Sequence, residues 1–252
     1  MPVIPKPCSN RPRLDVALVD RGLAESRHKA QALIMAGSVR VDGRIAAKPA
    51  FPVTPEARIE VSEPARFVSR GGEKLEHALR FFGLDVTGMF CLDVGASTGG
   101  FTDCLLQRGA ARVVAVDVGR GQLHARLRAD SRVLLREGLN ARFLAPSDLP
   151  EPPGFACVDV SFISLAKIMP AVAAVLRPGA AIVTLVKPQF EAGRDQVSRG
   201  GVVRDPAVRA EVLARVRRMG EHGAGLVWVG VVESPLTGPA GNVEFLACWR
   251  RP

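Results

Sequence analysis

The chain has 252 residues, enough for one large domain or for a mid-sized domain joined to a small one. Apolar residues make up 47% and charged residues 23%, a composition that excludes a disordered chain. The 34 Lys and Arg residues outnumber the 25 Asp and Glu residues, so the formal net charge is +9 and an anionic partner is expected.

The sequence carries no strong signal for a membrane, for secretion or for a metal. The longest uncharged apolar stretches, 168–176 and 178–186, are each too short to span a bilayer. The first 13 residues lack the apolar core that a signal peptide needs. The five cysteines are scattered, without the spacing of a disulfide framework or a zinc site. We therefore expect a cytoplasmic protein with no membrane partner and no metal.

The N-terminal quarter of the chain predicts a small domain. Residues 1–10 contain three prolines and predict a flexible tail. Helix start and stop signals predict helices over 12–22 and 26–37. Alternating apolar residues around an Asp-Gly turn predict a hairpin over 39–45, and a further strand is expected over 57–61.

Basic residues gather on and around the two predicted helices. They are Arg13, Arg21, Arg27, His28, Lys29, Arg40 and Arg44. A run of charges is commonly a solvated surface, and that interpretation stays open. The pattern S-R-H-K-A-x-x-L-I-x-x-G-x-V-x-V-D-G resembles the S4 RNA-binding domain, within a predicted domain at 11–61. The resemblance implies that these seven residues bind structured RNA, which proteins grip mainly through phosphate and 2′-hydroxyl contacts.

A predicted linker at 62–70 leads to a second domain at 71–252, in which strands and helices alternate. The pattern is typical of an α/β, Rossmann-like domain with a seven-stranded, mostly parallel sheet. Strands are expected over 89–94, 112–117, 132–135, 155–160, 180–186, 226–232 and 243–249. Helices are expected over 73–82, 100–109, 120–129, 164–176 and 205–221.

A glycine-rich run follows the first strand of this domain. Glycines at a strand-to-helix turn let the backbone approach a ligand, and a carboxylate that ends the next strand, Asp117, can bind the two hydroxyls of a ribose. Asn140, after the third strand, is placed to meet an adenine, although a turn-forming role is equally open. The candidate cofactor residues are Asp93, Gly95, Ala96, Ser97, Thr98, Gly99, Gly100, Asp117 and Asn140.

Two details favour S-adenosylmethionine over NAD as the cofactor. The spacing G-A-S-T-G-G differs from the G-x-G-x-x-G that grips a pyrophosphate. Asp93 ends the first strand, where a carboxylate would attract a sulfonium or ammonium group and repel a diphosphate. An NAD-dependent enzyme stays an alternative.

Four further residues suggest the chemistry. Asp159 ends the fourth strand, Lys187 follows the fifth, Lys74 lies in the helix before the first strand and Glu244 begins the last strand. Each alone has an ordinary interpretation as a surface charge. The Asn/Asp-Pro-Pro-aromatic segment of amino-group methyltransferases is missing, and Cys157 lies inside a strand, where it cannot attack a pyrimidine ring.

Together the four residues resemble the Lys-Asp-Lys-Glu tetrad of FtsJ-like ribose 2′-O-methyltransferases. Over residues 13–250 the chain is similar to the TlyA family, in which an S4 domain precedes that catalytic domain. The motifs R-G-G-E-K-L, D-V-G-A-S-T-G-G-F-T-D, V-D-V-S-F-I-S-L, L-V-K-P-Q-F-E and S-P-L-T-G-P-A-G-N-V-E-F occur in order. The resemblance implies S-adenosylmethionine-dependent 2′-O-methylation of cytidine in ribosomal RNA or ribosomal subunits, with catalysis by Lys74, Asp159, Lys187 and Glu244.

A ribose hydroxyl is a weak nucleophile until its proton is removed. We expect Lys187 to be the base, since burial and a neighbouring lysine favour its neutral form, and Asp159 to align it. Lys74 and Glu244 are expected to orient the ribose. The long segment 189–205, rich in glycine and charge, is a candidate RNA-contacting lid.

Two other functions and the oligomeric state complete these expectations. The chief alternative is a non-catalytic RNA-binding factor for ribosome assembly. The TlyA family also carries a haemolysin label, but a strongly amphipathic basic helix is missing, so membrane lysis is not expected. A monomer is favoured.

Overall fold

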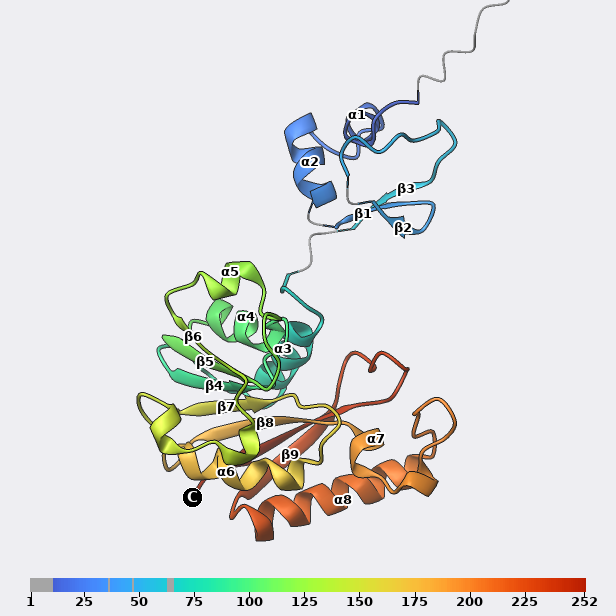
Figure 1. Ribbon diagram of the computed structural model, residues 1–252. Coiled ribbons are helices and arrows are strands. Elements are labelled where there is room, and N and C mark those ends of the chain that lie inside the picture. Colours follow the sequence, from blue (N-terminus) through green and yellow to red (C-terminus); the bar gives the residue numbers. More distant parts are fainter. Residues whose placement is uncertain (1–10, 36, 47, 63–65) are drawn as a thin grey trace, which may run out of the picture. The chain divides into compact units, whose positions relative to one another are not determined.

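The computed structural model describes residues 11–35, 37–46, 48–62 and 66–252. The chain divides into two compact units, Met1–Arg66 and Phe67–Pro252 (Figure 1). The expected flexible tail at 1–10 lies outside the described residues. Of the segment 62–70, expected as a linker, Phe67 packs into the core of the second unit. Within the described ranges, no helix is both long enough and apolar enough to cross a membrane.

The first unit packs two helices on a small antiparallel sheet. Its elements are α1 (Leu14–Asp20), α2 (Arg27–Met35), β1 (Val39–Val41), β2 (Arg44–Ile45) and β3 (Ile59–Val61), with strand order β2-β1-β3. Apolar side chains spaced at helical intervals, such as Leu14 and Leu18 of α1, are fully buried against Ile34 of α2 and Val39 of β1. The helix, hairpin and strand predictions are therefore confirmed to within two residues at each end.

The second unit alternates strands and helices along the chain. Its helices and strands are α3 (Gly71–Phe81), β4 (Phe90–Val94), α4 (Gly100–Gln107), β5 (Arg112–Asp117), α5 (Ala125–Arg128), β6 (Val133–Glu137), β7 (Phe155–Val158), α6 (Met169–Val175), β8 (Ala181–Val186), α7 (Pro188–Glu191), α8 (Pro206–Gly223), β9 (Val227–Glu233) and β10 (Phe245–Arg250). Short 3-10 turns occur at Ala141–Phe143, Pro146–Asp148, Leu165–Lys167 and Arg194–Gln196.

These strands form one seven-stranded sheet in the order β6-β5-β4-β7-β8-β10-β9. The first five strands are parallel, and β10 pairs antiparallel with both β8 and β9. The predicted Rossmann-like fold with a mixed, mostly parallel sheet is confirmed. The strand order reverses direction between β4 and β7, and in such sheets ligands bind at the carboxyl ends of the strands beside that reversal.

Helices cover both faces of the sheet, as Figure 1 shows. One core joins the sheet to α6 and α8, and the other joins it to α3 and α4. Trp249 of β10 is fully buried in the first core, and its indole nitrogen donates a hydrogen bond to Thr184 Oγ1 at 3.1 Å. The buried strands position the loops at their carboxyl ends with little freedom.

Three predicted elements differ from the structure. The helix expected over 164–176 is divided into a 3-10 turn at Leu165–Lys167 and α6, which begins at Met169. The helix expected over 120–129 is reduced to the four residues of α5, since Gly121 adopts a left-handed backbone with φ +71° that ends any helix there. The strand expected over 155–160 ends at Val158. Asp159 and Val160 therefore leave the sheet and belong to the loop at its carboxyl edge.

Candidate active site

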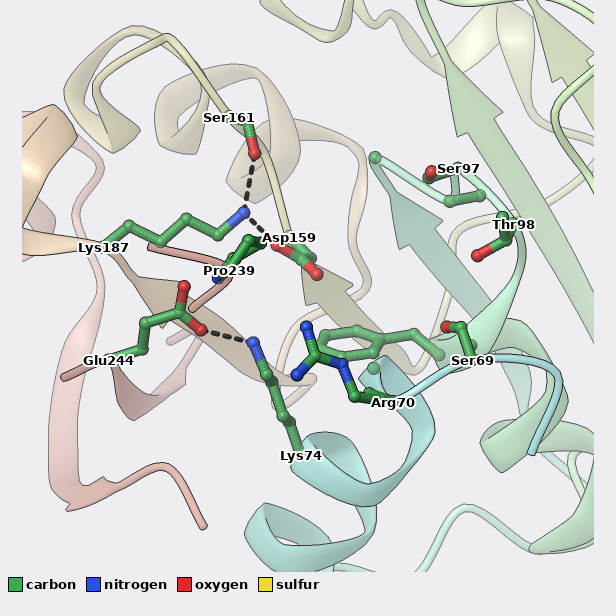
Figure 2. A pocket seen from close by; sticks show the side chains of 15 residues that line it. Ser69, Arg70, Lys74, Ser97, Thr98, Asp159, Ser161, Lys187, Pro239 and Glu244 are labelled. Carbon is green, nitrogen blue, oxygen red and sulfur yellow. Dashed lines mark hydrogen bonds and ion pairs between the residues drawn. The ribbon is translucent and has the colours of Figure 1, made fainter. Parts of the chain in front are cut away.

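A pocket opens at the carboxyl edge of the sheet, between β4, β7 and β8. Its walls include all four residues of the predicted tetrad, Lys74, Asp159, Lys187 and Glu244 (Figure 2). Glu244 reaches this edge because β10 runs opposite to β8, so that the start of β10 lies beside the end of β8 and Phe245 pairs with Val186. The structure thus brings together residues that lie as far as 170 positions apart in the sequence.

Lys187 and Asp159 form one ion pair of this pocket. The ammonium nitrogen of Lys187 lies 2.6 Å from Asp159 Oδ1 and donates a hydrogen bond to Ser161 Oγ at 2.8 Å. The Lys187 side chain is 11% exposed and that of Asp159 is 24% exposed, so both still reach the open pocket. Figure 2 shows Lys187 held between the hydroxyl and the carboxylate. A substrate group at this position would meet an amine whose direction is already fixed.

Lys74 and Glu244 form the second ion pair. Lys74 belongs to α3 and donates to Glu244 Oε2, and the carboxylate side chain is only 1% exposed. A buried carboxylate is costly unless a cation and hydrogen bonds satisfy it, so the two groups hold each other in place. The four tetrad charges thus form two pairs, and Arg70 adds a further positive charge to the wall of the same pocket.

A second cavity, of about 480 Å³, shares a wall with the first and falls in the size range of small-molecule sites, about 300–1,000 Å³. Gly95, Ser97 and Asp159 line both cavities. Asp117 lines the second cavity, and its carboxylate accepts hydrogen bonds from the backbone N–H groups of Ser97 and Gly119 at 2.8 Å and 2.7 Å. The cavity therefore places a fixed carboxylate beside the glycine-rich turn.

Gly95 is the glycine that this arrangement requires. Its φ is +85°, and a Cβ added to it would lie 2.3 Å from the carbonyl oxygen of Asp159. The close approach of the ends of β4 and β7 at this point thus depends on the missing side chain. Asn140 also lines the second cavity, and its side chain accepts from the backbone N–H of Arg142 and caps a 3-10 turn. Both interpretations of Asn140 made from the sequence are compatible with this position.

The remaining cofactor candidates fall into two groups. Ala96, Thr98 and Gly100 line the tetrad pocket. Asp93 and Gly99 line neither cavity. A Cβ on Gly99 would lie 2.3 Å from Leu127 Cδ1, so this glycine serves the packing of α5.

Asp93 differs most from the expectation that it faces a ligand cation. Its side chain is fully buried beneath the turn, where Oδ2 accepts a hydrogen bond from Thr102 Oγ1 at 2.6 Å. Burial raises the pKa of Asp93 to about 7, and the nearby Asp159 carboxylate contributes to the increase. Asp93 is therefore not placed to contact a sulfonium directly.

The predicted RNA-binding residues of the first unit are all exposed on its surface. Arg21 donates to the backbone carbonyls of Thr54, Pro55 and Ala57, which ties α1 to the segment before β3. Other candidates differ in their contacts: Arg40 donates to the carbonyl of Gly43, Arg13 and Arg27 both donate to Asp15, and Lys29, His28 and Arg44 are exposed.

Several residues of the pocket were missed in the sequence. Ser69, Arg70, Phe101, Ser161 and Pro239 line it. Arg70 and Ser161 lie inside the motifs that carried the family resemblance. Their closeness in sequence to Lys74 and Asp159 could have identified them as residues of the pocket.

Asn242 was also missed, and it braces the turn before Glu244. Its Oδ1 accepts from the backbone N–H of Val203 at 2.9 Å, and its Nδ2 donates to the carbonyl of Gly201 at 2.8 Å. The predicted lid is partly regular, because it contains α7, a 3-10 turn and a bridge between Ser198 and Val202.

Comparison with known proteins relates both units to described families. The family model described as FtsJ-like methyltransferase matches residues 67–251, and the family model of the S4 domain matches residues 12–59. The 16S/23S rRNA (cytidine-2′-O)-methyltransferase TlyA from Mycobacterium tuberculosis is 52% identical over 249 residues, which cover 96% of this chain and 91% of that protein. Hemolysin A from Brachyspira hyodysenteriae is 44% identical over 237 residues, 93% of this chain and 98% of that protein.

A solved structure gives the same relationship. A protein from Streptococcus thermophilus, described as a candidate hemolysin, has a TM-score of 0.75 at 44% sequence identity, over 95% of this chain and 88% of that one. The matches extend across both units, and the family resemblance seen in the sequence motifs is confirmed. The chain belongs to the TlyA family of FtsJ-like methyltransferases with an S4 domain.

Proposed function

We propose that this protein transfers a methyl group from S-adenosylmethionine to the ribose 2′-hydroxyl of cytidine in ribosomal RNA. One observation carries the proposal: two lysines and two carboxylates from four separate segments meet in one pocket that shares a wall with a second cavity. The name of the relative from M. tuberculosis supports the reaction and the substrate. The S4 match supports RNA as the partner.

The second cavity suits an adenosine-bearing cofactor. Each Asp117 oxygen has a further lone pair beyond its backbone hydrogen bond, so the carboxylate can still accept from two ribose hydroxyls. Asn140 offers an amide for an adenine, and Gly95 lies in the wall that the two cavities share. When bound there, S-adenosylmethionine would supply an electrophilic methyl group at the wall that the cavities share.

Lys187 is the base in this proposal. Once the Lys187 ammonium has lost a proton to solvent, its amine would accept the proton of the 2′-hydroxyl as that oxygen is methylated. Asp159 and Ser161 fix the direction of the amine through the contacts at 2.6 Å and 2.8 Å. A placed base contributes about 10²–10⁴-fold to such a rate, and alignment of the reacting atoms supplies much of the rest.

Lys74 and Glu244 orient the ribose. Their ion pair lies next to the Lys187–Asp159 pair in the same pocket, as Figure 2 shows, and offers a donor and an acceptor to the sugar hydroxyls. The segment 189–205 would close over the bound nucleotide as an RNA-contacting lid. The protein acts as a monomer in this proposal, because all four groups come from one chain.

The test is transfer of a labelled methyl group to ribosomal subunits that lack ribose methylation, followed by digestion to nucleosides. The wild type should yield 2′-O-methylcytidine. Lys187→Ala should lower the rate by about 10²–10⁴-fold. Lys167→Ala is the matched control, because Lys167 is exposed outside both cavities. It should leave the rate unchanged.

Other outcomes would redirect the proposal. Label on a base would keep the methyltransferase activity and reject the tetrad mechanism. A lack of label with intact binding to subunits would favour the RNA-binding assembly factor. Equal rates for Lys187→Ala and Lys167→Ala would reject Lys187 as the base.

A further inference from the structure

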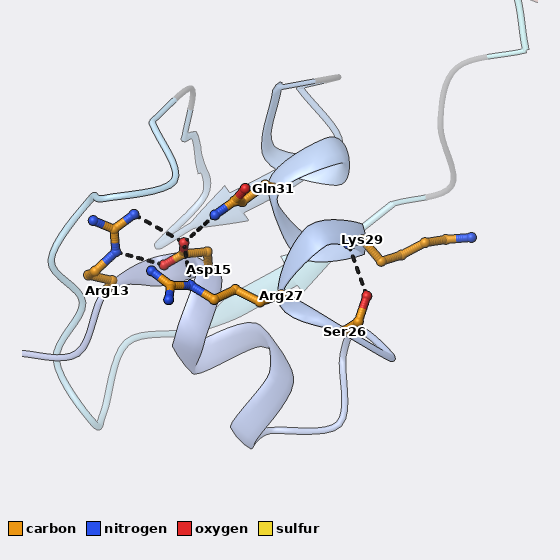
Figure 3. A network of polar contacts seen from close by, with 6 residues as sticks. All are labelled: Arg13, Asp15, Ser26, Arg27, Lys29 and Gln31. Atoms are coloured by element: carbon orange, nitrogen blue, oxygen red, sulfur yellow. Dashed lines mark hydrogen bonds and ion pairs between the residues drawn. The ribbon is translucent and has the colours of Figure 1, made fainter.

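One buried carboxylate of the first unit joins two exposed arginines. Asp15 of α1 is 0% exposed, yet it accepts four hydrogen bonds (Figure 3). Arg13 donates from Nε and Nη2 at 2.9 Å and 3.0 Å, Arg27 donates from Nε at 3.0 Å, and Gln31 donates from Nε2 at 2.8 Å. The carboxylate is therefore fully satisfied, which its burial requires.

The network joins the beginnings of two helices. Arg13 is the N-cap residue of α1, Arg27 is the first residue of α2, and Gln31 lies about one turn further along α2. Asp15 thus fixes where the two guanidinium groups stand relative to each other. Figure 3 shows both of them gathered around the same carboxylate.

The outer sides of both guanidinium groups stay available. The side chain of Arg13 is 46% exposed and that of Arg27 is 56% exposed, whereas the Asp15 carboxylate between them is enclosed. A guanidinium carries five N–H donors, of which Arg13 gives two to Asp15 and Arg27 gives one. Several donors therefore point away from the carboxylate, and planar guanidinium donors match phosphate oxygens well.

Arg21 shows what a differently placed arginine does in this unit. Its guanidinium donates to three backbone carbonyls and stabilises the fold. Arg13 and Arg27 instead donate to a carboxylate, Asp15. It stays ionised, since their hydrogen bonds hold the pKa of Asp15 well below its usual range. A permanent negative charge on a basic surface repels RNA phosphates. Asp15 can therefore favour RNA binding only by holding the two arginines in position.

We propose that Asp15 is the positioning residue of a phosphate clamp, in which it holds Arg13 and Arg27 side by side to grip the backbone of structured RNA. The inference rests on the proposed function, which makes ribosomal RNA the partner. It adds a role for a residue that carries the wrong charge for RNA contact.

The sign of one effect separates this role from simple electrostatics. Asp15→Asn raises the formal net charge from +9 to +10, so charge alone predicts tighter RNA binding. Loss of positioning predicts weaker binding. Asp20→Asn makes the same charge change at an exposed position of the same helix and is the matched control.

The experiment measures equilibrium binding of the full chain to purified ribosomal subunits that lack ribose methylation, at one fixed salt concentration. Asp15→Asn should weaken binding by about 5-fold to 20-fold, because both arginines lose their fixed geometry. Asp20→Asn should bind as the wild type does or slightly more tightly. In an Arg13→Ala/Arg27→Ala background, Asp15→Asn should cause no further loss.

A second variant covers the case in which Asp15→Asn disturbs folding, which circular dichroism would reveal. Gln31→Ala removes a neutral donor from the carboxylate and leaves every charge in place. It should weaken binding in the same direction by a smaller factor, about 2-fold to 5-fold. Wild-type affinity in Gln31→Ala, together with an unfolded Asp15→Asn, would assign Asp15 a structural role only.

Two results would overturn this inference and leave the proposed function standing. One is equal RNA affinity for Asp15→Asn and Asp20→Asn. The other is that Asp15→Asn weakens binding as much in the Arg13→Ala/Arg27→Ala background as in the wild type. Failure of the wild type to bind subunits would overturn the RNA partner of the proposed function as well. Failure of methyl transfer with binding intact would leave the clamp standing, since binding is measured without the reaction.

Discussion

Asp93 shows how strongly a single residue can respond to enclosure. Its Oδ2 accepts from Thr102, but its Oδ1 has no hydrogen-bond partner among the described residues. Burial raises the pKa of Asp93 from an ordinary 3.8 to about 7, so the folded protein binds a proton that the unfolded chain has already released. Folding is therefore coupled to the protonation of a group directly beneath the active site.

The pH dependence of stability follows from that coupling. A raised carboxyl pKa contributes stability that is complete below about pH 4 and is lost as the pH rises to about 7. Between pH 5 and pH 8 the free energy of unfolding of the wild type should therefore fall relative to that of Asp93→Asn, by about 1–4 kcal/mol. Denaturant unfolding of the second unit at several pH values measures this difference. Parallel curves for the two proteins would contradict the prediction, and the exposed Asp195→Asn should follow the wild type.

Ser161 gives a second prediction for a single residue. Its hydroxyl oxygen accepts from the Lys187 ammonium at 2.8 Å, so Ser161→Ala removes a hydrogen bond to a charged group. We expect kcat for methyl transfer to fall by about 10-fold to 100-fold, since the direction of the amine is less well fixed. Single-turnover rates across a pH series would check this. Ser161→Thr should restore much of the rate, whereas the exposed Ser147→Ala should change nothing.

At the scale of elements, the catalytic arrangement depends on the order and direction of the strands in the sheet, which local sequence does not determine. Buried apolar runs predicted the seven strands of the sheet to within about two residues. The insertion of β10 between β8 and β9 depends on pairing between distant segments, so periodicity could not predict it. The tetrad could be anticipated from motif order. The enclosure of Asp93 could not, because it depends on how the turn at 95–99 folds over the strand end.

The turn between β4 and α4 yields a prediction at this scale. Gly95→Ala would place a Cβ 2.3 Å from the carbonyl oxygen of Asp159, so the ends of β4 and β7 must separate. We expect a loss of at least 10-fold in S-adenosylmethionine affinity by calorimetry and a lower melting temperature. Gly83→Ala also has a positive φ but meets nothing within 4 Å, so it isolates the backbone cost of about 1–2 kcal/mol. Equal affinities for the two variants would show that the close approach at Gly95 is unimportant.

For the whole molecule, the net charge of +9 sets the character of its association with RNA. Each phosphate that a basic side chain neutralises releases counterions, so affinity falls as salt rises. The four tetrad charges are paired with one another, Lys74 with Glu244 and Lys187 with Asp159. The salt dependence of binding should therefore come mainly from exposed arginines elsewhere.

The corresponding prediction concerns the slope of log affinity against log salt for ribosomal subunits. Arg13→Ala/Arg27→Ala should reduce the steepness of that slope by about two, one for each phosphate that an arginine no longer neutralises. Lys74→Ala should leave the slope nearly unchanged while abolishing transfer. Binding titrations between about 50 and 200 mM salt measure both. A slope unaffected by the double substitution would assign phosphate binding to other residues.

The reversed last strand has a practical consequence. Strand β10 starts at the active-site edge of the sheet and ends where Arg250 pairs with Ala181, the first residue of β8. The carboxyl end of the chain therefore emerges from the second unit at the edge opposite the tetrad. A dye or a surface linker attached at the exposed Arg250 would lie at the far edge of the sheet from the tetrad, so it would keep clear of the pocket of the second unit.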